Sequence, residues 1–473
     1  MQSLRRHLKE HQGHLPGAIP TEFLDRHDFK SCPICGNIIA NSLKHCRKCA
    51  PLFRAASSTS CSNTPATEGL PSLDEICMTR VRLFKHIPKR ARGLWGEVLA
   101  KAIASAVHYN TAQAWTELMM LPKCVLLTPP RSGKSNKRAS TAFIKLRCDR
   151  WLSGQRKELW EDGPAARTRR HSSRDSNPGS HHDTEHRQRQ CFDYAADGMY
   201  AKATKVLTSP GPLSRNEETE KALRDKHPQS HQVPRLDDLA APCLEDVPTL
   251  ESTLIMKMLK TFPWGSGAGP TGLRAQHLMN ASNSSHGDET TEQLTALCNL
   301  LARGQAPAFL AAYLGGATLL ALEKPRGGVR PIAIGEVLRR LVAKCLCKLY
   351  EGEAATYLWP RQIGVAAPLG AEVGTQTVRQ WYERNRSLAG KIIFAADFEN
   401  AFNTVDRETF LREVRHHMSG MARWTEWCYG NPSKLFFDGT VILSQVGVQQ
   451  GDPIGPLLFA LALQPVIMQL SNI

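Results

Sequence analysis

Residues 392–396 (IIFAA) form a continuous apolar run that is followed at once by an acid, Asp397. An apolar run without polar alternation is typical of a β-strand that is buried on both faces. We therefore expect a covered sheet, with Asp397 at the end of a strand where its carboxylate can face a cleft. A carboxylate in that position commonly holds a metal ion or a catalytic proton, and metal-assisted chemistry needs more than one such acid.

The composition describes a basic globular chain. Its 473 residues allow two or three domains, and 41% of them are hydrophobic. The net charge of +16 suits a polyanionic partner such as nucleic acid, although a merely basic solvated surface would give the same charge. No apolar run reaches the roughly 18 residues that span a bilayer, so we expect no membrane partner. The oligomeric state is left open.

Four cysteines near the N-terminus form two CxxC pairs that are separated by ten residues: Cys32, Cys35, Cys46 and Cys49. Each pair can turn both thiolates towards one ion, and two pairs complete a tetrahedral structural Zn²⁺ site. His45 is an alternative ligand, and reduced surface thiols are the alternative to a metal site. The short loop between the pairs favours a compact zinc knuckle within residues 1–55.

The chain between this knuckle and residue 246 divides by composition. Residues 56–75 are rich in Ser, Thr, Pro and Ala and are typical of a linker. Apolar residues at helical spacing predict a helical region over 76–160, which includes a small helical domain that ends at Pro122. Residues 161–192 hold almost no apolar side chain and predict a disordered basic linker. A helical connector is expected over 193–245.

After residue 245 the pattern changes to dense apolar periodicity that is broken by Gly and Pro turns. The loop GSGAGPTGL at 265–273 would let its backbone approach a neighbouring segment closely. Lys324 and Arg330 bracket a Gly327–Gly328 turn, so a hairpin could direct both cations at one anion. Two solvated hairpin charges are equally compatible with this stretch.

Three further features lie near the C-terminal end. Asp406 precedes RETFLREV and predicts a helix N-cap. KLFFDGTVIL predicts a hairpin with its turn at Asp438 and Gly439. Asp452 and Pro453 fit the N-cap and first residue of an apolar helix, so we do not assign Asp452 as a metal ligand.

Two stretches, AADFENAFNTVDR and GVQQGDPIGPLLFALALQPV, resemble the first and second palm motifs of reverse transcriptases, and in particular those of the non-LTR (LINE-type) retrotransposon group. GSGAGPTGL, LEKPRGGVRPIAIGEVLRRLVAK and RQIGVAAPLGAEVGTQTVRQW occur in the same order in that group. The resemblance covers about residues 250–473. It implies an α+β fold in which residues 246–473 form incomplete right-hand polymerase fingers and palm, preceded by the small zinc knuckle and a helical segment.

The resemblance also implies roles for single residues. Asp397 would hold two Mg²⁺ ions, with the carbonyl of Phe398 completing the shell of one of them. Phe402 would exclude a 2′-hydroxyl and so favour a DNA product. Two cations would neutralise the triphosphate of the incoming nucleotide, and two residues would touch its sugar and the template base pair: Lys324, Arg330, Gln450 and Gly451.

An RNA template, a DNA primer or target and deoxynucleoside triphosphates are the implied partners, and the nucleus is the implied location. In the family, the further acids lie in an aromatic-Ala-Asp-Asp motif after the second palm motif, and ADD occurs nowhere in this sequence. We therefore expect an RNA-directed DNA polymerase that is truncated before its third palm motif and inactive as it stands. A non-catalytic nucleic-acid-binding remnant is the alternative. An intron-encoded maturase agrees less well with the cysteine knuckle.

Overall fold

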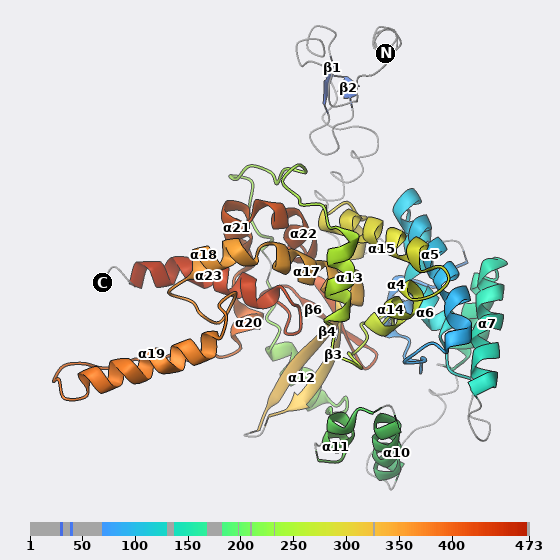
Figure 1. Cartoon of the computed structure of the whole chain (residues 1–473), viewed down its shortest axis with the longest axis horizontal. Helices are drawn as coiled ribbons and strands as arrows, with labels where there is room; N and C mark the ends of the chain where they lie inside the picture. The colour runs from blue at the N-terminus through green and yellow to red at the C-terminus, as the bar shows by residue number, and fades with distance from the viewer. Residues whose placement is uncertain are drawn as a thin grey trace. The chain divides into compact units, whose positions relative to one another are not determined.

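The computed structural model (Figure 1) describes residues 29–31, 38–40, 69–129, 137–167, 182–196, 198–208, 211–230, 232–324 and 327–470. The chain divides into two compact units, one of residues 1–64 with 243–246 and the other of residues 65–242 with 247–473. Over the described residues, no helix has both the length and the apolar character that a membrane crossing requires.

Two short strands are described in the first unit, β1 (Phe29–Ser31) and β2 (Ile38–Ala40). They pair antiparallel, with Ser31 opposite Ile38. The predicted zinc ligands lie outside the described residues, as does the alternative ligand His45: Cys32, Cys35, Cys46 and Cys49. The zinc knuckle therefore stays a prediction.

The second unit begins with a layer of helices. These are α4 (Leu73–Met78), the 3-10 helix η1 (Lys89–Ala91), α5 (Arg92–Tyr109), α6 (Ala112–Val125), α7 (Lys137–Leu152), α8 (Arg156–Trp160) and the π-helix η2 (Glu161–Ala165). In α5 the buried residues recur at helical spacing: Trp95, Val98, Leu99 and Ile103. Pro122, where a small helical domain was expected to end, lies inside helix α6. The helix continues to Val125 because its last turn is buried in the core, and the Pro122 carbonyl still accepts a hydrogen bond from the Leu126 amide.

The segment 161–192, expected to be a disordered linker, is helical at both of its described ends. Its first residues form η2, and its last residues belong to α10 (His182–Ala196), while residues 168–181 lie outside the described part. Arg187 of α10 donates hydrogen bonds to the Val206 carbonyl of α11 (Tyr200–Thr208), at 2.8 and 3.1 Å. Polar contacts with a neighbouring helix thus accompany the helical conformation of α10, and the rest of the predicted linker stays a prediction.

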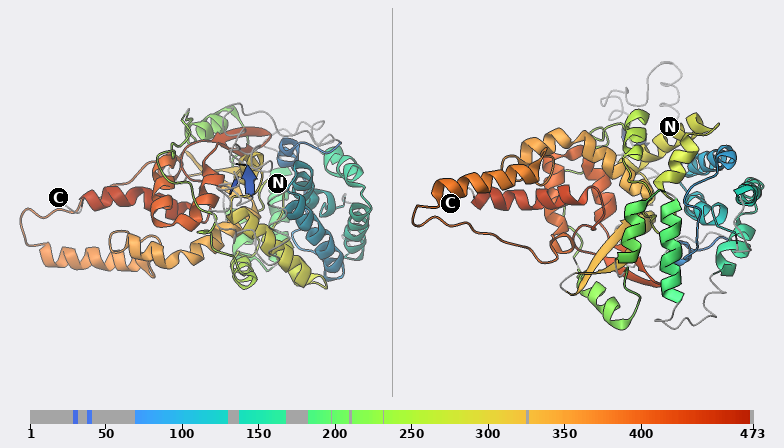
Figure 2. Two further views of the ribbon diagram at one scale, coloured as in Figure 1. Left: turned by 90° about the horizontal axis from the view of Figure 1, so that it is seen from above. Right: turned by 60° about the horizontal axis from the view of Figure 1, so that its bottom comes forward.

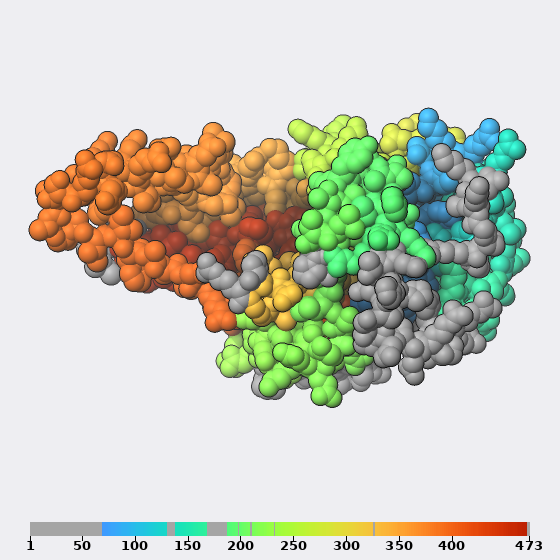
Figure 3. All heavy atoms as spheres, turned by 90° about the horizontal axis from the view of Figure 1, so that it is seen from below, coloured from blue at the N-terminus to red at the C-terminus, as the bar shows by residue number. Residues whose placement is uncertain are grey.

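The remaining helices surround a small sheet. They are α12 (Glu217–Asp225), α13 (Ser252–Lys260), α14 (Ala275–Ser282), α15 (Gly287–Ala302), η3 (Ala308–Leu310), α16 (Ala311–Leu314), α17 (Val337–Leu349), α18 (Glu351–Leu358), α19 (Gly370–Asn385), α20 (Ala401–Thr404), α21 (Arg407–His417), α22 (Ser419–Tyr429) and α23 (Gly455–Leu470). Helix α19 and the segment after it project from the rest of the second unit (Figures 2 and 3).

The sheet has the strand order β4-β3-β5-β6. Its strands are β3 (Ala317–Glu323), β4 (Val329–Gly335), β5 (Ser433–Phe437) and β6 (Thr440–Ser444). β3 runs antiparallel to β4 and parallel to β5, and β5 and β6 form a hairpin. Alternate residues of β3 are buried, as expected of a strand with one face on the core. The β3–β4 hairpin extends towards α12 (Figure 1), whose Leu223 packs against the sheet.

The strand predicted at 392–396 is absent. Residues 391–398 are extended, irregular and exposed, and 86% of the Phe394 surface is accessible to solvent. An apolar run becomes a strand only when neighbouring strands satisfy its backbone hydrogen bonds. None of the described strands pairs with this segment, so the apolar side chains are left at the surface.

Candidate functional site

The loop 445–452, which belongs to the second predicted palm motif, lies against the end of α20. The Val448 amide donates to the Phe402 carbonyl at 2.7 Å, and the Gly447 amide donates to the Val405 carbonyl at 3.0 Å. A Cβ atom on Gly447 would lie 2.4 Å from the Phe402 oxygen, so only glycine allows this approach. The two segments that carry the predicted palm motifs are therefore joined through backbone hydrogen bonds.

The same loop also contacts β4. The Ala333 amide donates to the Gln450 carbonyl at 3.0 Å. Gly451 has a φ of +117°, and a Cβ there would lie 2.4 Å from the Ala333 oxygen. Both features require glycine at this position. Gln450 and Gly451 thus lie between β4 and α20, and Gly451 is exposed.

A buried polar network fixes the conformation of this loop from behind. Arg339 of α17 forms an ion pair with Asp452 at 2.6 Å, and Tyr429 donates to the same carboxylate at 2.7 Å. Arg339 also donates to the Gln449 side chain at 2.8 Å, and Gln449 in turn donates to the Gly315 carbonyl at 2.7 Å. Burial disfavours the charged guanidinium, but the charge and hydrogen bond of Asp452, together with Tyr429 and Cys428, outweigh this effect and raise the pKa of Arg339 above its ordinary value.

This network corrects the expectation for Asp452. Helix α23 begins at Gly455, two residues after Pro453, and the shortest contacts of the Asp452 carboxylate are with Arg339 and Tyr429. The only contact of this carboxylate that resembles helix capping is a weak one, in which it accepts a hydrogen bond from the Ile454 amide at 3.4 Å. The sequence feature that could have indicated a buried ion pair is Arg339 itself, because a charge among the apolar residues of VLRRLVAKCL needs a buried partner.

The predicted hairpin of Lys324 and Arg330 is confirmed. Leu322 is opposite Arg330, and the Lys324 amide donates to the Gly328 carbonyl at 3.0 Å. Leu322 and Arg330 are opposite one another in the ladder, so their side chains share one face, and Lys324 directly follows the end of β3. Arg330 is exposed and Lys324 is half-buried.

The charge of Lys324 reaches the segment after Asp397. Lys226 donates to the Glu399 carboxylate at 2.7 Å, and this hydrogen bond and charge, together with the charge of Lys324, lower the pKa of Glu399. The Lys324 charge therefore lies within electrostatic range of Glu399. The sequence analysis did not identify Glu399 and Lys226, since these two residues are 173 positions apart in the sequence.

Asp397 itself lies on the exposed segment before α20. Within the described part of the chain it makes no hydrogen bond or ion pair, and no three His, Cys, Asp or Glu residues are grouped so that they could hold a metal ion. Phe398 is also exposed. One free carboxylate, with Glu399 already paired to Lys226, does not fit a site for two Mg²⁺ ions. We therefore derive no chemical step through these ions.

Phe402, which was predicted to exclude a 2′-hydroxyl, is a partly buried residue of α20. Its ring stacks on Phe459 of α23, with 5.3 Å between the ring centroids and 25° between the planes. One ring face is thus supported by a neighbouring helix. This packing holds the ring in place, and its role towards a nucleotide stays a prediction.

The glycine loop at 265–273 makes the close approach that its composition predicts. A Cβ on Gly269 would lie 2.7 Å from the Cα of Glu336, at the end of β4. Beside it, the Thr271 amide and hydroxyl donate to the buried Glu336 carboxylate at 2.6 and 2.8 Å. This loop therefore packs against the same strand that supports Gln450.

Comparison with known proteins agrees with this arrangement. The family model described as reverse transcriptase (RNA-dependent DNA polymerase) matches residues 322–473. The match begins in β3 and includes the hairpin with Lys324 and Arg330, the segment with Asp397 and Phe402, and the loop with Gln450 and Gly451. This part of the chain is therefore similar to a reverse transcriptase domain. A comparison with curated proteins gives no match.

Proposed function

We propose that this chain is an RNA-directed DNA polymerase of a non-LTR retrotransposon. The observation that carries the proposal is the double contact of the loop 447–451, with α20 on one side and β4 on the other. This contact brings the two segments with palm-like motifs next to the strand that ends in the cationic hairpin. The family match over residues 322–473 supports the same reading.

In this proposal, each of these residues of the site has one task. Lys324 and Arg330 neutralise the triphosphate of the incoming nucleotide, where negative charge develops on the leaving pyrophosphate. Gln450 and Gly451 contact the sugar and the template base pair. Phe402, supported by Phe459, excludes a 2′-hydroxyl and selects deoxynucleotides.

Asp397 is the proposed Mg²⁺ ligand, and Phe398 would add its backbone carbonyl. Since residues 397–399 offer one unpaired carboxylate, we also propose that the polypeptide of residues 1–473 binds its substrates without extending a primer.

The partners proposed are an RNA template, a DNA primer or target, and deoxynucleoside triphosphates. A nuclear location is proposed because target-primed insertion takes place on chromosomal DNA. A zinc knuckle within residues 1–55 is proposed as an additional structural element.

Primer extension on an RNA template with Mg²⁺ and deoxynucleotides, combined with deoxynucleotide binding, tests these proposals. We expect binding that Lys324→Ala weakens, without extension. Asp149→Ala, which changes an exposed aspartate of α7 outside the matched region, is the control for Asp397→Ala. Extension that disappears only in Asp397→Ala would support the polymerase and contradict the proposed inactivity. Failure of the chain to bind deoxynucleotides would contradict the polymerase and leave the nucleic-acid-binding remnant.

A further inference from the structure

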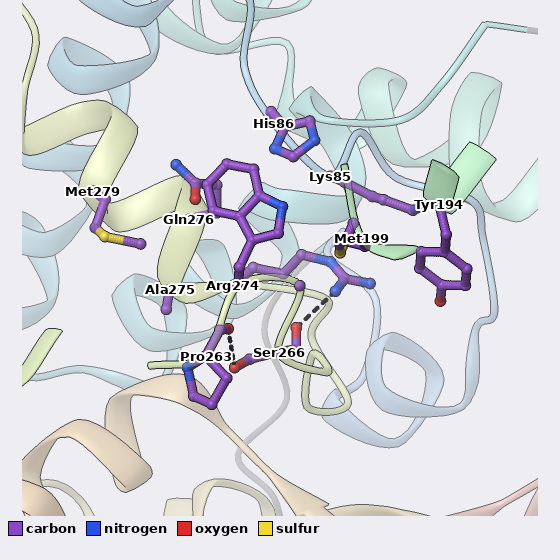
Figure 4. Close-up of a pocket in the computed structure, with 12 residues that line it drawn as sticks. Lys85, His86, Tyr194, Met199, Pro263, Ser266, Arg274, Ala275, Gln276 and Met279 are labelled. Atoms are coloured by element: carbon purple, nitrogen blue, oxygen red, sulfur yellow. Dashed lines mark hydrogen bonds between the residues drawn. The ribbon is translucent and has the colours of Figure 1, made fainter. Parts of the chain in front are cut away.

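A pocket outside the matched region combines aromatic rings with cations (Figure 4). It is formed by the segment before η1, the end of α10, the start of α11, the loop after α13 and the start of α14. Figure 4 shows Arg274 crossing the middle of the pocket, with Lys85 and Tyr194 on one side of it. None of the described residues that line the pocket is acidic.

Two aromatic contacts shape the pocket. The Trp264 ring stacks on His86, with 5.1 Å between the centroids and 23° between the planes, and 52% of the Trp264 surface remains exposed. The Lys85 ammonium lies 4.3 Å from the centroid of the Tyr194 ring. An indole that is backed by a second ring and open to solvent is a platform on which a planar group can stack.

The cations are held in place by the loop that carries the indole. Lys202 donates to the carbonyls of Trp264 and Gly265 at 3.1 and 2.7 Å, and Arg274 donates to the Ser266 carbonyl at 2.8 Å. The Nε of Arg274 is buried and has no hydrogen-bond partner among the described residues. Burial lowers the pKa of Lys202, and the neighbouring charges of Arg274 and Lys85 lower it further. These positive charges repel one another, so an anion would relieve the repulsion.

The pocket is also connected to the candidate site. The loop that begins at Trp264 continues to Gly267, whose carbonyl accepts a hydrogen bond from Arg340 of α17 at 2.7 Å. At the same glycine the backbone lies against Ile334 of β4, next to Ala333, which binds the Gln450 carbonyl. A strand of nucleic acid that follows this loop would therefore run from the pocket towards β4.

We propose that this pocket binds one nucleotide of a single-stranded nucleic acid, with its base stacked on Trp264 and its phosphate held by Lys85 and Arg274, next to the charge of Lys202. Stacking requires a base that is not already covered by neighbours, so the site selects single strands over duplexes. The inference rests on the proposed function only in taking nucleic acid as the partner. It does not require polymerase activity.

Binding of a fluorescently labelled oligouridylate to the full chain, measured by anisotropy, tests the stacking. Trp264→Ala should weaken binding by at least about fivefold, the equivalent of about 1 kcal/mol for one stacked base. Trp264→Phe should retain most of the affinity. Trp359→Ala is a matched control, because Trp359 is exposed to the same extent, 52%, and does not line the pocket. Binding of a DNA duplex should be the same in all four proteins.

The salt dependence of the same binding tests the phosphate contact. Lys85→Gln should reduce the slope of log affinity against log salt by about 0.7, as expected for the loss of one phosphate contact to a single strand. Lys101→Gln, which removes an exposed lysine paired with Glu97 on α5, should leave the slope unchanged.

Three results would overturn the inference. They are unchanged oligouridylate affinity in Trp264→Ala, equal weakening in the Trp359→Ala control, and weakening of duplex binding to the same degree. These outcomes leave the proposed function standing. If the unaltered chain binds no oligouridylate at all, the nucleic-acid partner of the proposed function fails together with this pocket.

Discussion

The guanidinium of Arg339 lies 2.6 Å from the carboxylate of Asp452, and both side chains are almost wholly excluded from solvent. This pair ties α17 to the loop that presents Gln450 and Gly451. Tyr429 satisfies the same carboxylate with a further hydrogen bond at 2.7 Å. The position of the exposed part of the loop therefore depends on charges that are themselves buried.

Breaking this ion pair should strongly destabilise the protein. Asp452→Asn keeps the size of the side chain but leaves the Arg339 charge buried without its counterion, which costs about 3–5 kcal/mol of unfolding free energy. Urea unfolding measures this loss. The exposed pair of Arg80 and Asp438, at 3.0 Å, provides the control, because Asp438→Asn should cost less than about 1 kcal/mol. Equal losses in the two variants would show that the buried pair does not fix the loop.

Glycine should be irreplaceable at the two points where the loop touches its supports. Gly451→Ala and Gly447→Ala introduce a Cβ at positive φ, 2.4 Å or less from a backbone atom, so each should cost more than about 1 kcal/mol. Gly352→Ala is the control. A Cβ there meets nothing within 4 Å and Gly352 lies inside α18, so this change should stabilise by about 0.4–1 kcal/mol. Thermal unfolding that ranks the three variants otherwise would contradict the loop geometry.

Local features of this chain were predictable and long-range ones were not. The Asp438–Gly439 turn has positive φ at both residues, and Asp406 caps α21 by accepting a hydrogen bond from the Thr409 amide at 2.7 Å. Such features depend on neighbours in the sequence. The segment 392–396 has strand-like composition, yet its conformation depends on whether other strands lie beside it.

The same distinction explains what was missed in the candidate site. The order of the motifs identified the hairpin with Lys324, the segment with Asp397 and the loop with Gln450. The partner of Asp452 is 113 residues away, and no local pattern encodes that distance. The pairing of Lys226 with Glu399 was equally inaccessible, because it joins α12 and the segment before α20 across 173 residues.

The pKa of Glu399 should report the proximity of the hairpin to residues 397–399. Lys226→Met removes the hydrogen bond that is the largest cause of the lowered pKa, and Lys324→Met removes a more distant charge. Both changes should raise the pKa of Glu399 towards its ordinary value, the first more than the second. Nuclear magnetic resonance of the Glu399 carboxyl carbon during a pH titration measures both shifts.

The control for this titration is Lys257→Met, a lysine of α13 that has no part in lowering the pKa of Glu399. It should leave the pKa unchanged. If the pKa of Glu399 were the same in the unaltered protein and in the Lys226→Met and Lys324→Met variants, the proximity of these two lysines to Glu399 would be contradicted. Because the folded-state pKa is lowered, the contribution of Glu399 to stability is present above its unfolded pKa and is lost as the pH falls through the folded value.

The predicted zinc knuckle can be tested separately from the polymerase region. Cys32→Ser should release zinc, because a thiolate ligand is replaced by a hydroxyl that binds Zn²⁺ poorly. Zinc content after dialysis, measured by a colorimetric chelator, gives the stoichiometry. Cys243→Ser changes an exposed free cysteine and should retain the metal. Zinc retained in the Cys32→Ser protein would point to His45 or another substitute ligand.

His277 should make the protein less stable in mild acid. The side chain is completely buried, its Nδ1 accepts from the Arg274 amide at 3.2 Å, and its Nε2 therefore carries the proton that faces the Phe84 carbonyl at 2.7 Å. Burial lowers its pKa to about 3. Because the unfolded chain protonates this imidazole near pH 6.5, its stabilising effect is complete above that value. As the pH falls from there towards 3, this group lowers the free energy of unfolding by about 1.4 kcal/mol per pH unit.

The variant His277→Gln isolates this contribution from that of the carboxylates, which titrate in the same range. Its unfolding free energy should fall less steeply between about pH 6 and about pH 4 than that of the unaltered protein, since no imidazole is left to protonate on unfolding. His108→Gln changes an exposed histidine in the last turn of α5 and should keep the original slope. Parallel slopes for His277→Gln and the unaltered protein would mean that His277 is already protonated, or accessible to water, in the folded state. In that case the N-terminus of α14, whose first residues line the pocket that contains Trp264, would be packed less tightly than the structure indicates.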